Sequence, residues 1–116
     1  MEFARLMEKA ETGQRFTRLF GTEKSCAWML HLKPGDHTDM HFHAEPETFL
    51  VVEGKASVKD INGGEHIIEQ GEVVFFPAKD YYQITNVGTG RLLLYGNRPE
   101  PFGGVHVTAK EHGERR

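Results

Sequence analysis

Glycine and proline divide this sequence into short segments, and most of these segments have the length of one β-strand. Runs rich in apolar and β-branched residues lie between the turns, at residues 26–32, 48–52, 56–61, 66–68, 73–76, 81–87 and 91–95. Asn62-Gly63-Gly64 separates two of these runs and is a strong signal for a β-hairpin. Strands with turn residues about every 8–12 positions indicate an antiparallel sandwich or barrel. The sequence therefore predicts an all-β fold.

The two ends of the chain depart from this pattern. Apolar residues recur at helical spacing within residues 2–10, which predicts a short N-terminal helix, with an edge strand as the alternative. The last stretch is rich in proline, glycine and charge, so we expect an extended arm with one strand at residues 105–108 and a frayed end. The predicted organisation is an N-terminal arm or short helix at 1–20, one barrel at 21–97 and a C-terminal extended arm at 98–116.

Length, charge and cysteine content exclude several classes of function. A chain of 116 residues has room for one domain. Its net charge of −3 and the absence of a basic cluster before the closing Arg115-Arg116 argue against a nucleic-acid partner or an anionic membrane. No apolar run approaches the roughly 20 residues of a membrane span, and the first residues do not form a secretory signal. The single cysteine, Cys26, cannot form an internal disulfide, which favours a cytoplasmic location.

His41, His43 and Glu47 form the most informative group of side chains. Side chains alternate along an extended chain, so His41 and His43 point to the same side. A turn at residues 44–46 would swing the Glu47 carboxylate back toward the two imidazoles. Such a set predicts a site for one divalent first-row metal ion (Mn, Fe, Ni or Zn) with positions left for substrate. The alternative is a buried polar cluster without metal, in which a protonated histidine balances the carboxylate.

The residues after Glu47 indicate which side chains face the interior. Phe49 and Val51 share the parity of Glu47 and should line the inside of the barrel. Leu50 and Val52 then face outward. Because both are apolar, we expect a second layer or another subunit to cover them.

Residues 35–54 resemble the first conserved motif of the cupin superfamily. In that motif a glycine, a His-x-His pair, a glutamate and a second glycine follow one another at fixed spacing. All of these positions are occupied here, by Gly35, His41, His43, Glu47 and Gly54. The match at every fixed position makes a chance resemblance improbable.

Residues 71–86 resemble the second cupin motif, with two departures. Gly71, Pro77 and Asn86 match it, whereas Lys79 replaces a glycine and Tyr82 replaces the third metal histidine of the family. The resemblance implies a small single-domain cupin of the conserved-barrel type, with a double-stranded β-helix (jelly-roll) fold. It also implies a metal site, a small-molecule substrate or ligand, and a homodimer.

Three roles are open for Tyr82. It could bind the metal as a phenolate, because a bound dication favours the deprotonated form. It could stand beside a three-ligand metal and transfer a proton as a catalytic residue. It could also line a ligand pocket that has lost its metal. His106, in the predicted late strand, is the reserve candidate for the missing ligand.

These observations favour a metalloenzyme that acts on an oxygen-rich or carbonyl-bearing metabolite by Lewis-acid and proton-transfer chemistry. The resemblance implies reactions such as dioxygenation, isomerisation, decarboxylation, elimination and cyclisation, and the tyrosine favours proton chemistry over dioxygen activation. The alternatives are a non-enzymatic small-molecule-binding cupin and a structural protein that retains the motif as scaffolding.

Overall fold

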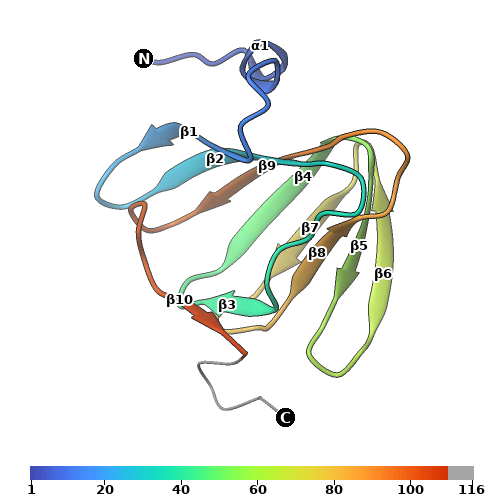
Figure 1. The fold of residues 1–116 in the computed structure, drawn as a ribbon. Helices are drawn as coiled ribbons and strands as arrows, with labels where there is room; N and C mark the ends of the chain where they lie inside the picture. Colours follow the sequence, from blue (N-terminus) through green and yellow to red (C-terminus); the bar gives the residue numbers. More distant parts are fainter. Residues whose placement is uncertain (110–116) are drawn as a thin grey trace.

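One short helix and ten β-strands make up the computed structural model, which describes residues 1–109 (Figure 1). The elements are α1 (Leu6–Ala10), β1 (Phe16–Gly21), β2 (Cys26–Leu32), β3 (His41–His43), β4 (Glu47–Glu53), β5 (Lys55–Lys59), β6 (Glu65–Glu69), β7 (Val73–Phe76), β8 (Gln83–Asn86), β9 (Leu92–Arg98) and β10 (His106–Thr108).

The strands form two antiparallel layers that face each other. One layer is a five-stranded sheet in the order β1-β2-β9-β4-β7. The other contains β6-β5-β8 and the pair β10-β3, and bridges of His41 with Tyr82 and of His37 with Thr85 connect them. This arrangement confirms the predicted all-β fold. The hairpin expected at residues 62–64 joins β5 to β6.

Each predicted strand segment overlaps an observed strand, because turn residues end the strands where the sequence indicates. Gly54 shows the reason at one turn: its φ of 103° is unfavourable for other residues, and a Cβ there would lie 2.6 Å from the Arg91 carbonyl oxygen. The strand that the sequence pattern missed is β1, which lies largely within the predicted N-terminal arm and pairs with β2.

The core lies between the two layers, and a second, smaller cluster lies outside the large sheet. Phe49 and Val51 point into the main core, as their parity predicts. On the outer face, Ala10 of α1 packs with Met29 and Leu93, and Val52 packs against this cluster. The expected cover over Val52 is therefore the N-terminal helix. This helix spans five residues. No helix within residues 1–109 is long and apolar enough to cross a membrane.

The chain after β9 returns across one end of the barrel. It forms β10 there, which pairs antiparallel with β3 (Figure 1). The late strand expected at residues 105–108 is therefore present, at His106–Thr108. The frayed end predicted for the C-terminal arm falls on residues 110–116, which lie outside the described residues.

Candidate metal centre

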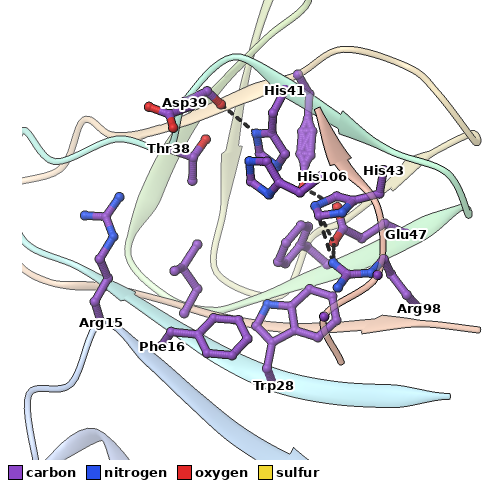
Figure 2. A pocket seen from close by; sticks show the side chains of 15 residues that line it. Arg15, Phe16, Trp28, Thr38, Asp39, His41, His43, Glu47, Arg98 and His106 are labelled. Carbon is purple, nitrogen blue, oxygen red and sulfur yellow. Dashed lines mark hydrogen bonds and ion pairs between the residues drawn. The ribbon is translucent and has the colours of Figure 1, made fainter. Parts of the chain in front are cut away.

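Three histidines meet at the end of the barrel where β3 and β10 pair. His41 and His43 lie on β3 with the spacing that puts them on one side, and His106 of β10 stands directly opposite His43. Their candidate ligand atoms all lie within 4.8 Å of one another. The imidazole of His106 is stacked on that of His41, with ring centroids 4.4 Å apart (Figure 2). The reserve candidate from the sequence thus joins the two motif histidines.

Backbone carbonyls orient two of the three rings. His41 Nδ1 lies 2.6 Å from the Asp39 carbonyl oxygen, and His43 Nδ1 lies 2.8 Å from that of Val105. A carbonyl can only accept a hydrogen bond, so each Nδ1 carries the proton and each Nε2 keeps its lone pair. Anchoring the Nδ1–H group in this way is the usual arrangement for a metal-binding histidine.

Both anchored imidazoles are neutral at pH 7. Burial lowers the pKa of His41 to about 4. Burial, assisted by the positive charge of Arg98, lowers the pKa of His43 to about 3. Neutral imidazole is the form that binds a metal, so no proton has to leave these two rings first.

The donor set fits a divalent first-row transition metal. Imidazole nitrogen suits Zn, Fe, Ni and Cu, and three such ligands leave positions for water or substrate. One contact opposes the ion: Arg98 Nη1 lies 3.4 Å from His43 Nε2. An ion bound by His43 has to replace this contact.

Glu47 lies beside this group of ligand atoms and is engaged by two other side chains. The residue is 2% exposed, and its Oε2 accepts a hydrogen bond of 2.5 Å from Arg98 Nη1. Its Oε1 accepts a hydrogen bond from the Tyr82 hydroxyl. His43 Nε2 is 3.8 Å from Glu47 Oε2. Burial raises the pKa of Glu47, while Tyr82 and Arg98 act in the opposite direction.

Tyr82 is a buried, protonated phenol in this structure. Its backbone pairs with that of His41, and its ring stacks on Phe76 at a centroid distance of 3.8 Å. Burial and the neighbouring charge of Glu47 raise the pKa of Tyr82 well above 10. The hydroxyl therefore donates to Glu47. Ligation of a metal by Tyr82 or Glu47 stays a prediction.

Arg98 is the residue of this site that the sequence patterns did not single out. It is the last residue of β9 and shares the inward parity of Leu92 and Leu94, which is the signal that could have found it. The side chain is buried and lies over the Trp28 ring, 4.5 Å from its centroid. Besides Glu47 it binds Glu100, at 2.9 Å.

A cavity of about 360 Å³ opens beside the histidines. Its lining consists of Arg15, Phe16, Trp28, Leu30, Thr38, Asp39, His41, His43, Glu47, Phe49, Tyr82, Arg98, Gly103, Gly104 and His106. Figure 2 shows the histidines, Glu47 and Arg98 together at one end, with Phe16 and Trp28 along the opposite wall. The candidate metal ligands thus face a space large enough for a small molecule.

The comparisons with known proteins identify the family. Residues 28–95, more than half of the chain, match the family described as the cupin domain. The protein therefore belongs to the cupin family, as its two motifs indicated. The search of curated proteins gave no match.

Solved structures with the same fold agree with this assignment. The protein TT1209 from Thermus thermophilus is 22% identical with a TM-score of 0.76, covering 87% of this chain and all of that one. An uncharacterized conserved protein with a double-stranded β-helix domain from Klebsiella pneumoniae is 18% identical with a TM-score of 0.71, covering 78% and 79%. A structure titled as DMSP lyases RdDddP and RnDddQII is 23% identical with a TM-score of 0.64, covering 75% and 45%. The predicted double-stranded β-helix is therefore confirmed.

Proposed function

We propose that this cupin is a metal-dependent enzyme that acts on a small carbonyl-bearing or oxygen-rich molecule. One divalent ion (Mn, Fe, Ni or Zn) would be held by His41, His43 and His106. The observation that supports this most is the pair of Nδ1 anchors, which fix two imidazoles with their Nε2 atoms unprotonated, within a group of three histidines. When bound, such an ion supplies a Lewis acid that polarises a substrate oxygen.

Tyr82 and Glu47 are the groups that move the proton. The Tyr82 oxygen takes a proton from the substrate while its own proton passes along the existing hydrogen bond to Glu47. The reverse transfer returns a proton at the end of the reaction. Arg98 holds Glu47 in place and keeps it charge-paired. In this mechanism Tyr82 and Glu47 stand beside the metal rather than binding it.

The lyase chemistry named for one similar structure is of the type that a Lewis acid and a proton-transfer pair could perform. At 23% identity that similarity supports the shared fold.

Elemental analysis tests the metal centre. We expect protein purified without a metal-chelating tag, or loaded with Zn²⁺ after chelator treatment, to hold about one ion per chain. His41→Ala and His43→Ala should abolish this, whereas His66→Ala, at an exposed position on β6, should not. Wild-type protein that takes up none of the four metals would refute the proposal.

We also propose that the protein works in the cytoplasm as a homodimer, without a nucleic-acid or membrane partner. Cys26, its single cysteine, is buried and free, which suits a reducing compartment. Val73 and Phe75 of the edge strand β7 are 60% and 58% exposed, and a second copy could cover them. Light scattering of the purified protein tests the dimer, and Phe75→Glu should shift it toward monomer.

A further inference from the structure

The wall opposite the histidines is a continuous aromatic surface. The rings of Phe16 and Trp28 lie side by side in Figure 2, with centroids 6.1 Å apart and planes inclined by only 21°. Phe49 meets Trp28 edge-on at 5.6 Å. A Cβ on Gly96 would lie 2.7 Å from both Trp28 and Phe49, so this glycine permits the packing. These rings form one apolar side of the cavity, on which Phe16 is 47% exposed and Trp28 and Phe49 are each 3% exposed.

Phe16 is the exposed member of this group of three rings. It lies on the edge strand β1 and is 47% exposed. Phe16 lines the cavity together with Leu30. A flat apolar group placed there would cover this surface and gain both burial and ring stacking.

The opposite end of the cavity favours an anion once a metal is present. Four charged side chains line the cavity, and the charges of Arg15 and Arg98 cancel those of Asp39 and Glu47. Histidines bind a metal as neutral imidazoles, so a bound dication gives the lining a net charge of +2, or +1 when Glu100, the second partner of Arg98, is included. Arg98 lies over Trp28 at the junction of the aromatic wall and the polar end. A negatively charged oxygen group placed there meets both the ion and a guanidinium.

The volume limits the size of the ligand. At about 360 Å³ the cavity is near the small end of ligand pockets, which span roughly 300–1,000 Å³. It has room for one ring with a short chain, and a dinucleotide or an oligosaccharide would not fit. A sugar would also face apolar groups along Phe16, Leu30 and Phe49, where its hydroxyls lose their water partners.

We propose that the substrate is a small organic anion with a flat aromatic body and two adjacent oxygens in its head group, as in an aryl-substituted 2-hydroxy or 2-oxo acid. The inference rests on the proposed metal centre. The oxygens bind at the ion beside Arg98, and the ring lies along Trp28 and Phe16. Neither the family nor the metal site requires this class; it follows from the wall, the charge and the volume.

Calorimetric titration of the Zn²⁺-loaded protein tests the substrate class, with 3-phenyllactate as the probe. We expect 3-phenyllactate to bind at least about tenfold more tightly than lactate, which lacks the ring, because the ring is buried on the wall. The affinity for 3-phenyllactate should also exceed that for 2-phenylethanol, which lacks the anionic head, by a similar factor. Trp28 is the only tryptophan of the chain, so quenching of its fluorescence places the ring on this wall.

A pair of phenylalanine variants locates the contact. Phe16→Ala should weaken binding of 3-phenyllactate by about three- to tenfold, the range typical of one aromatic pair, and leave lactate unchanged. Phe16→Tyr should restore it. Phe3→Ala is the matched control, because Phe3 is 85% exposed near the start of the chain and lies outside the cavity. It should change neither affinity.

The outcomes separate this inference from the metal centre. Protein that holds one Zn²⁺ but binds 3-phenyllactate no better than lactate, glucose or 4-methyl-2-hydroxypentanoate refutes the aromatic class and leaves the metal centre standing. An unchanged affinity in Phe16→Ala refutes the assigned wall. Protein that takes up no metal refutes both proposals.

Discussion

Arg98 donates a hydrogen bond of 2.5 Å to Glu47, and both side chains are almost completely buried. The glutamate of the first cupin motif is thus charge-paired by a residue from a different strand. Because Tyr82 binds the other carboxylate oxygen, Glu47 already has two partners before any metal arrives. The histidines and this Tyr82-Glu47-Arg98 chain are therefore two adjacent parts of one site.

Arg98→Met should destabilise the fold strongly. The change leaves the Glu47 carboxylate buried without its cation, which typically costs about 3–5 kcal/mol in the free energy of unfolding. Arg91→Met is the control, because the ion pair of Arg91 with Glu53 is partly exposed and such pairs contribute little to stability. Urea unfolding at pH 7 measures both variants. Equal decreases in the free energy of unfolding would show that the buried pair stabilises the fold no more than the exposed pair does.

The ligand set can be decided by comparing two substitutions. His106→Ala should lower Zn²⁺ affinity by at least about 100-fold, since it removes one of three ligands. Glu47→Gln keeps the shape of the side chain and should retain most of the affinity. Competition with a chromophoric chelator measures both. If Glu47→Gln lost the metal and His106→Ala kept it, the ligand set predicted from the sequence would be the correct one.

The stability of the metal-free protein should fall in mild acid. The folded-state pKa values of His41 and His43, about 4 and 3, lie below the ordinary 6.5, so the unfolded chain binds more protons. The free energy of unfolding therefore has its full value well above pH 6.5. It decreases as the pH falls from 6.5 toward the folded-state pKa values. Thermal unfolding in the presence of a chelator measures this.

His41→Gln should flatten this pH profile, because it removes one of the two titrating groups. His66→Gln, at an exposed position, should leave the profile as it is in the wild type. A wild-type melting temperature that stays constant between pH 7 and pH 4.5 would contradict the low pKa values.

Tyr82→Phe should separate an enzyme from a binding module. The metal-loaded protein in D₂O is expected to exchange the methyl protons of pyruvate faster than the free ion does, because Tyr82 and Glu47 accept the proton. Loss of the hydroxyl should slow this exchange by about 100-fold or more with the metal content unchanged. Tyr95→Phe, outside the cavity, is the control. Absence of exchange in the wild type would favour the non-enzymatic binding cupin.

The sequence by itself determined most of the strands, the turns and the direction of neighbouring side chains. Alternation along β3 puts His41 and His43 on one side, and alternation along β4 puts Phe49 inside, because successive side chains of a strand point to opposite faces. These are local properties, so short-range patterns are sufficient to predict them. The two cupin motifs are also local patterns, so the sequence by itself was sufficient to indicate the family.

Only the tertiary structure decided which distant residues complete the site. His43 Nδ1 is anchored by Val105, 62 residues away, and Glu47 is paired with Arg98, 51 residues away. Such partners depend on which strands become neighbours, and strand order is settled by packing of the whole core rather than by local pattern. His106 could be named from the sequence as a reserve ligand, but the pairing of β10 with β3 was needed to bring it to the other two histidines.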